Sequence, residues 1–308
     1  MDRPENSRLL VAVDVDGTLL NTEFDEVLRP REIEAMEGVR AAGHVLALCT
    51  GRNLNSIRGL LEQSRWYPDD LPMVLLNGAV VWGGQPRRQL ARNILTGEQI
   101  RDLVAIFTAH DTVPMVYGTD EDGGVLHHAT RPVNDILGHY LAMRQSRVGA
   151  IHEANDLLDL PWEQALEVGT IDVEDKVMAL TAAINDRLAG QVKVINTRSL
   201  LGQGRYYWAE VFHAASDKGM GLRVVADDVG IPVERSVAIG DNFNDLDMFA
   251  AAGVSVAMAG SPDAVKACAD LVTGDVTEGG AAAILEQIAA GDFPAPDQAD
   301  VLQPRSDS

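Results

Sequence analysis

Apolar runs of strand length recur along the first part of the chain, and each of them ends in polar residues. The first run, Leu9–Val13, is followed by Asp14 and Asp16 and then by Thr18. Residues two apart on an extended segment share a face, so the two carboxylates should lie close together. They would repel each other unless a cation joins them. The simpler alternative is a strand that ends in an ordinary polar turn.

Two later strands repeat this pattern and are separated by helical patterns. Thr50, Gly51 and Arg52 follow the second strand, and Asn77 follows the third. Strand-helix steps of this kind predict a doubly wound parallel sheet with right-handed crossovers. The expected elements are, in chain order, Pro30–Ala42 (helix), His44–Cys49 (strand), Asn53–Gln63 (helix) and Met73–Leu76 (strand).

From about Gly83 the pattern changes, because several strand-like pieces follow one another beside loops rich in Gly, Asp and Arg. This is typical of an α+β unit with an antiparallel sheet, which we expect to be a separate domain. The expected helices are Thr96–His110, Asn134–Gln145 and Val173–Leu188, and the expected strands are Thr112–Tyr117, Gly124–Ala129, Leu166–Ile171, Val192–Asn196 and Tyr206–Phe212.

The alternation of helices and strands then resumes. The first domain therefore looks interrupted and then completed, which predicts an α/β fold with a doubly wound (Rossmann-like) parallel-sheet core and an inserted α+β domain. We expect the core at 1–83 and 214–291, the insertion at 84–213 and a disordered Pro- and Asp-rich tail at 292–308. The resumed elements are Asp217–Asp228 (helix), Ser236–Ile239 (strand), Asp245–Ala251 (helix), Val254–Met258 (strand), Pro262–Ala269 (helix) and Gly280–Ala289 (helix).

Composition limits the classes of partner. The net charge of −21 argues against a nucleic-acid partner, because phosphate backbones need a basic patch. No apolar run is long enough to span a membrane, and the polar segment Met1–Ser7 favours a cytoplasmic protein. Cys49 and Cys268 are predicted to be buried thiols and not to form a disulfide. The oligomeric state is not indicated.

The part of the first domain that follows the insertion adds a lysine and further acids at the ends of strands. Lys218 stands at a helix start, and Asp241 follows the strand Ser236–Ile239. Since the carboxyl ends of parallel strands meet at one edge of a sheet, these groups should converge there with Asp14 and Thr50. Hard carboxylate oxygens suit Mg²⁺, while a hydroxyl, a lysine and backbone amides suit phosphoryl oxygens. The sequence therefore predicts a phosphoryl-transfer site.

Four segments resemble the four motifs of the haloacid dehalogenase superfamily, in the same order. Within that superfamily, the sequence is most similar to the Cof-like branch of Mg²⁺-dependent phosphatases. They are Asp-Val-Asp-Gly-Thr, Thr-Gly-Arg, Asp-Lys-Gly and Gly-Asp-Asn-Phe-Asn-Asp. The resemblance implies a cytoplasmic phosphatase acting on a small phosphorylated metabolite, such as a sugar phosphate or a phosphorylated cofactor. It also implies that the insertion is a cap that selects the substrate.

The resemblance further implies a role for each matching residue. Asp14 would be the nucleophile that forms an aspartyl-phosphate, and Asp16 the acid and base that also offers its backbone carbonyl to Mg²⁺. The remaining roles would be phosphate binding by Thr50, Gly51, Lys218 and Asn244, metal binding by Asp241 together with Asp14 and Asp16, and support by Asp245, Arg52 and Asn77. In one departure, Met258-Ala259-Gly260-Ser261 stands where the branch often has Met-Gly-Asn-Ala.

Two other functions remain open at this point. A phosphomutase would keep the aspartyl-phosphate but return the phosphoryl group to the sugar, and a phospho-accepting signalling module would hold it for longer. Residues of the insertion receive no role in catalysis: His127, His128 and Arg131 are read as surface residues. Three of the four tryptophans are read as packing residues, namely Trp82, Trp162 and Trp208.

Overall fold

The fold was obtained as a computed structural model, which describes residues 8–22, 25–120, 123–129, 134–144, 150–154, 157–159, 165–199 and 204–294. Arg131, Trp162 and residues 295–308 of the expected tail lie outside these ranges. The chain forms two compact units. The first comprises the described parts of Met1–Gly51, Leu60–Arg92 and Asp217–Ser308, and the second those of Arg52–Gly59 and Asn93–Ser216.

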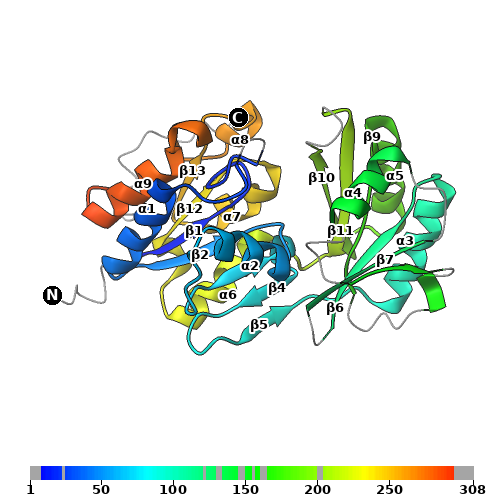
Figure 1. The fold of residues 1–308 in the computed structure, drawn as a ribbon, viewed down its shortest axis with the longest axis horizontal. Coiled ribbons are helices and arrows are strands. Elements are labelled where there is room, and N and C mark those ends of the chain that lie inside the picture. The colour runs from blue at the N-terminus through cyan, green and yellow to red at the C-terminus, as the bar shows by residue number, and fades with distance from the viewer. Residues whose placement is uncertain are drawn as a thin grey trace. The chain divides into compact units, whose positions relative to one another are not determined.

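The first unit is built on a sheet of eight strands among the described residues, in the order β14-β13-β12-β1-β2-β3-β4-β5 (Figure 1). Neighbouring strands from β14 to β3 run parallel, whereas β4 and β5 are antiparallel additions at one edge. The strands are β1 (Leu10–Val13), β2 (Val45–Cys49), β3 (Met73–Leu75), β4 (Val80–Trp82), β5 (Gln89–Arg92), β12 (Ser236–Gly240), β13 (Val254–Ala257) and β14 (Leu271–Val272).

Helices pack against this sheet. In Figure 1, α1 and α9 lie together, and α1 also contacts β2. Helix α6 contacts α7 and strands β2, β4 and β5. The α/β fold with a doubly wound core is thereby confirmed. The helices are α1 (Pro30–Ala41), α2 (Leu54–Gln63), α6 (Lys218–Val229), α7 (Leu246–Ala251), α8 (Asp263–Lys266) and α9 (Gly280–Ala290), of which α2 is divided between the two units.

The central strand β1 is buried along its whole length. Leu10 and Ala12 belong to the same apolar core as Leu222 and Val225 of α6. Since side chains alternate along a strand, the next residue on that side is Asp14. Its backbone nitrogen donates to the carbonyl of Ile239, 2.9 Å away, which extends the pairing with β12 past the end of β1. The packing of β1 in the core thus positions Asp14 at the edge of the sheet where α6 begins.

The structure corrects several expected boundaries. No crossover helix follows β3; the chain turns back instead through the short antiparallel strands β4 and β5. Because β5 pairs with β4, residues 84–92 belong to the first unit and not to the insertion. The helix expected at Pro262–Ala269 is only the four residues of α8. Phe293 is buried, so 292–294 are part of the fold and not of a tail.

The second unit has a six-stranded sheet in its described residues, in the order β10-β11-β9-β6-β7-β8. The expected antiparallel pairing is found between all neighbouring strands of these residues except β7 and β8, which run parallel. Its apolar core joins Val168 of β9 to Leu180 of α5 and Phe107 of α3. The elements are α3 (Gly97–Ala109), β6 (Met115–Asp120), β7 (Gly123–Ala129), α4 (Asp135–Arg144), β8 (Ala150–Ala154), β9 (Ala165–Val173), α5 (Glu174–Arg187), β10 (Val192–Arg198) and β11 (Tyr206–His213).

Two expectations from composition concern the whole chain. In the described ranges, no helix combines the length and the apolarity needed to cross a membrane. Both cysteines are free thiols, but only Cys49 is buried. Cys268 is exposed, because it lies in the turn after the short helix α8 and not within a longer helix packed on the core.

Candidate active site

A buried lysine joins two carboxylates at the start of α6. The Nζ atom of Lys218 lies 2.6 Å from Oδ1 of Asp14 and 2.6 Å from Oδ1 of Asp245. All three residues are buried, and the exposed fraction of Lys218 is 0%. The Asp217 side chain accepts a hydrogen bond from the Met220 backbone nitrogen, which caps the helix and fixes where it begins. The cap therefore determines where the lysine side chain leaves the backbone.

Burial and neighbouring charges both shift the pKa values of the acids in this cluster. Burial raises the pKa of Asp14, and Asp245, Asp241 and Asp16 raise it further, against the opposing effect of Lys218. Burial, with repulsion from Asp245, also raises the pKa of Asp241 to about 7. For Lys218, burial acts to lower the pKa, but the two carboxylates outweigh it and raise that pKa. A cation among these acids would offset their mutual repulsion.

Asp241 lies at the end of β12 and faces the turn after β1. The hydroxyl of Thr18 donates to Oδ1 of Asp241 over 3.2 Å. Gly17, which stands between Asp16 and Thr18, adopts φ +89°. A Cβ atom on Gly17 would lie 2.3 Å from Oδ2 of Asp241. Only glycine fits both the backbone conformation and the close approach. This contact brings the ends of β1 and β12 together.

The carboxylates offer a binding site for a hard divalent cation. Asp14, Asp241 and Asp245 each place one oxygen within 4.8 Å of those of the other two. Asp245, however, already accepts hydrogen bonds at both oxygens: Oδ1 from Lys218, and Oδ2 from the backbone nitrogens of Asp241 and Asn242 at 2.9 and 3.0 Å. Asp14 and Asp241 are therefore the acids best placed to ligate a metal, and Asp245 holds its neighbours in position. Carboxylate oxygens match the preference of Mg²⁺.

The turn after β3 meets the end of β2. The Asn77 backbone nitrogen donates to the Thr50 carbonyl over 3.1 Å, and the Asn77 side-chain oxygen accepts from the Asn244 amide over 3.0 Å. A Cβ atom on Gly51 would lie 3.3 Å from the Asn77 amide nitrogen. Asn77 itself adopts the left-handed conformation, with φ 51° and ψ 34°. Thr50, Gly51, Asn77 and Asn244 thus form one polar group.

Gly78 ties that turn to the start of α6. It adopts φ +95°, and a Cβ atom on it would lie 2.2 Å from the backbone oxygen of Asp217. The backbone of the turn therefore packs directly against the residue before Lys218. The turn with Asn77 and the lysine occupy neighbouring positions in the same unit.

Not every expected site residue joins the cluster. The side chain of Asp16 is half-buried and is not one of the three clustered carboxylates, although its expected metal contact was through the backbone carbonyl. Arg52 is grouped with the second unit, so no contact with the cluster is assigned to it. Cys49 lies at the end of β2, but burial raises the pKa of its thiol to about 12, which leaves it protonated at neutral pH and unsuited to act as a nucleophile.

Two residues of the site received no role from sequence reasoning. Thr18 is hydrogen-bonded to Asp241, and Asn242 forms a capping box with Asp245 at the 3₁₀ helix η7 (Phe243–Asp245). The capping box has a sequence signal, since Asn242 and Asp245 are three apart at a helix start. The Thr18 contact joins segments 223 residues apart and has no local signal.

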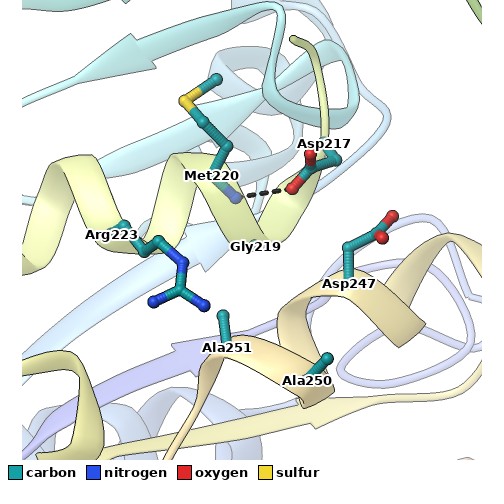
Figure 2. A pocket seen from close by; sticks show the side chains of 7 residues that line it. All are labelled: Asp217, Gly219, Met220, Arg223, Asp247, Ala250 and Ala251. Carbon is teal, nitrogen blue, oxygen red and sulfur yellow. Dashed lines mark hydrogen bonds between the residues drawn. The ribbon is translucent and has the colours of Figure 1, made fainter. Parts of the chain in front are cut away.

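A surface groove lies between α6 and α7. Figure 2 shows the Asp217 carboxylate turned toward the Met220 nitrogen, with Arg223 and Asp247 also in the groove. It encloses about 290 Å³. None of the expected site residues lines it, although Asp217 and Gly219 stand on either side of Lys218 in the chain. Its lining residues are Asp217, Gly219, Met220, Arg223, Asp247, Ala250 and Ala251.

Comparison with known proteins gives relatives along nearly the whole chain. The family model for haloacid dehalogenase-like hydrolases matches residues 11–285. The 5-amino-6-(5-phospho-D-ribitylamino)uracil phosphatase YitU of Bacillus subtilis is 26% identical, and the match covers 92% of this chain and 98% of that protein. The pyridoxal phosphate phosphatase YbhA of Escherichia coli is 27% identical, with coverage of 87% and 94%.

Solved structures share the fold. A haloacid dehalogenase-like hydrolase from Bacteroides thetaiotaomicron superposes with a TM-score of 0.72 at 24% identity, and the match covers 91% of this chain and 99% of that one. At this level of identity the likeness concerns the fold.

Proposed function

Because the chain belongs to the family of haloacid dehalogenase-like hydrolases, we propose that it is a Mg²⁺-dependent phosphatase acting on a small phosphorylated metabolite. The observation that carries the proposal is the buried contact of Lys218 with Asp14, next to Asp241. The names of the two relatives, a phosphatase of a phosphorylated ribitylaminouracil and one of pyridoxal phosphate, support a sugar phosphate or a phosphorylated cofactor as the substrate class.

In the first half of the proposed reaction, a carboxylate oxygen of Asp14 attacks phosphorus. The new bond joins that oxygen to phosphorus, while the bond between phosphorus and the ester oxygen breaks. Asp16 gives a proton to the departing alkoxide, which leaves as an alcohol. Asp14 then carries the phosphoryl group as an aspartyl-phosphate.

In the second half, water attacks the phosphorus of the aspartyl-phosphate. Asp16, now a carboxylate, takes a proton from the water, and the bond between phosphorus and the Asp14 oxygen breaks. Inorganic phosphate leaves, Asp14 regains its carboxylate and Asp16 its proton. Over both halves, one phosphate ester and one water molecule are converted into one alcohol and one inorganic phosphate.

The proposed metal site uses oxygens of Asp14 and Asp241 with the backbone carbonyl of Asp16. When bound there, Mg²⁺ would offset the repulsion between the phosphate and the carboxylates. Thr50, Gly51, Lys218 and Asn244 would bind the phosphoryl oxygens, and Asp245, Arg52 and Asn77 would support them. Lys218 also holds the Asp14 carboxylate in place, because its Nζ atom contacts one of the two Asp14 oxygens.

The second unit is proposed to select the substrate. It carries its own sheet and its own apolar core, so it can vary without disturbing the carboxylate cluster, which lies wholly in the first unit. A small molecule is the proposed partner, and the charge of −21 speaks against a nucleic acid.

Phosphate release from a panel of phosphorylated metabolites, with and without Mg²⁺, tests the proposal. Asp14→Asn should reduce kcat by at least about 10³-fold, because the amide cannot attack phosphorus. Asp263→Asn is the matched control, since Asp263 is a fully exposed acid of the same unit and should leave the rate unchanged. Full activity of Asp14→Asn would refute the proposal. An isomerised substrate without free phosphate would indicate a phosphomutase instead.

A further inference from the structure

Phe243 differs from every other Phe, Tyr and Trp residue in the described ranges. Its exposed fraction is 51%, whereas the others are buried or half-buried. A single exposed apolar residue is ordinary on a protein surface. This one, however, begins the 3₁₀ helix η7, whose last residue, Asp245, contacts Lys218. The exposed ring therefore belongs to the turn that builds the candidate active site.

The backbone that carries this ring is held on both sides. The Asn242 side-chain oxygen accepts a hydrogen bond from the Phe243 nitrogen over 2.8 Å. The Asp245 side chain accepts from the nitrogens of Asp241 and Asn242, and its own nitrogen donates to the Asn242 carbonyl over 3.0 Å. The turn is thus fixed before any ligand arrives, and a contact with the ring would cost little entropy.

The position of Phe243 sets what it can touch. It lies two residues after Asp241 and one before Asn244, so its Cα atom is within about 7 Å of the Asp241 Cα atom. The proposed Mg²⁺ and phosphate contacts use Asp241 and Asn244. A phosphate bound by these two residues would bring the rest of its substrate close to the short segment that carries the ring. Every other side chain of the stretch from 241 to 245 is polar.

We propose that Phe243 is a specificity-determining residue whose ring stacks on a flat aromatic or heteroaromatic leaving group of the phosphate ester. The inference rests on the phosphatase activity proposed above and adds the chemical class of the alcohol that is released. An offset-stacked ring pair is favourable, and a sugar or polyol leaving group offers no such face. Esters of aromatic alcohols therefore gain more from this ring than esters of aliphatic ones.

The test compares one aromatic and one aliphatic ester, pyridoxal 5′-phosphate and glycerol 3-phosphate. The ratio of their kcat/KM values should fall about tenfold in Phe243→Ala, a change of about 1.4 kcal/mol. Phe243→Tyr should keep the ratio, since it keeps the ring, and Phe243→Leu should lower it, since it keeps only apolar volume. Val272→Ala is the matched control: Val272 is 54% exposed in the same unit and its loss should not change the ratio.

The outcomes separate this inference from the proposed function. If the wild-type protein hydrolyses these esters and neither Phe243→Ala nor Phe243→Leu changes the ratio, the inference is overturned and the phosphatase stands. A loss of equal size for both esters also overturns it, because it would mean that the ring only covers the site. If the wild-type protein releases phosphate from neither ester and from no member of a metabolite panel, the proposed function fails and the inference falls with it.

Discussion

The Nζ atom of Lys218 lies 2.6 Å from Oδ1 of Asp14, although the two residues are 204 positions apart. The Lys218 side chain is 0% exposed and that of Asp14 is 5% exposed. In this low-polarity environment the lysine charge compensates two carboxylates, because Asp245 lies equally close on its other side. The same contact that orients the proposed nucleophile therefore also gives two buried carboxylates a counter-charge.

We expect Lys218→Met to damage both stability and catalysis. Methionine keeps most of the side-chain volume but leaves Asp14 and Asp245 buried without a counter-charge, which should cost about 3–5 kcal/mol of unfolding free energy. The loss of a donor to the phosphoryl group should lower kcat by about 10²–10³-fold. Urea unfolding and phosphate release measure the two effects.

Lys176→Met is the control for that experiment. Lys176 is 40% exposed and pairs with Asp111 and Asp172 at 3.2 and 3.7 Å. Exposed ion pairs contribute little, so its loss should cost less than about 1 kcal/mol. Equal destabilisation by the two substitutions would contradict the role given to Lys218.

Asn77→Gly should weaken phosphate binding without destabilising the fold. Glycine adopts the φ of 51° without strain but removes the oxygen that accepts from Asn244, so the Asn244 amide loses its orientation. We expect kcat/KM to fall about tenfold, as for the loss of one hydrogen bond. The inhibition constant of inorganic phosphate should rise by a similar factor.

Asn77→Ala separates the side chain from the backbone. It removes the same oxygen and should give the same kinetic loss. In addition, it places a Cβ in the left-handed region, which should cost about 1–2 kcal/mol more than glycine does. Wild-type kinetics in both variants would show that Asn77 does not position Asn244.

Much of the catalytic edge could be predicted because it follows strong local patterns. Asp14, Thr50 and Asp241 each come directly after a buried apolar run, and parallel strands bring such positions to one edge. The resemblance to the haloacid dehalogenase superfamily is confirmed by the family match over residues 11–285. The parallel pairing of β1, β2 and β3 also agrees with the expected alternation of strands and helices.

The edge strands could not be predicted in the same way. β4 has only three residues and begins three residues after Asn77, so its sequence resembles a continuation of that turn. β5 is half-exposed and rich in polar residues, without the apolar alternation that marks a strand. The hydrogen bond of Thr18 with Asp241 depends on how distant segments meet, which a local pattern cannot encode.

Removal of the metal should affect stability as well as activity. Excess EDTA should abolish phosphate release, and added Mg²⁺ should restore it. Burial and repulsion from Asp245 raise the pKa of Asp241 to about 7. At pH 8 a bound cation would therefore offset the unfavourable negative charge of the Asp241 carboxylate. Mg²⁺ at 100 times its dissociation constant should stabilise the fold by about 2.7 kcal/mol. Calorimetric melting with and without Mg²⁺ measures this shift.

Asp241→Asn should reduce the shift caused by Mg²⁺, since it removes one proposed ligand. Asp263→Asn should not, because Asp263 is an exposed acid outside the cluster. A full Mg²⁺ shift in Asp241→Asn would place the metal elsewhere.

The second unit should lose stability as the pH falls, because of His127. Burial lowers the pKa of His127 from 6.5, and the neighbouring His152 and His128 lower it further. The ring of His152 stacks on it with centroids 5.2 Å apart. The unfolded chain therefore binds a proton more readily than the fold does, so the stability that the neutral ring contributes is present above the unfolded pKa, near pH 6.5. It is lost as the pH drops toward and below the folded pKa.

Substitution isolates this effect from the other titrating groups. In His127→Gln the melting temperature should fall less steeply between pH 7 and pH 5 than in the wild-type protein, because the side chain no longer titrates. His139→Gln should keep the wild-type slope, since His139 is exposed on α4 of the same unit. Parallel pH profiles for wild-type and His127→Gln would show that protonation of His127 costs the fold nothing. A steeper profile in His127→Gln would contradict the predicted sign, because it would mean that protonation of His127 stabilises the fold.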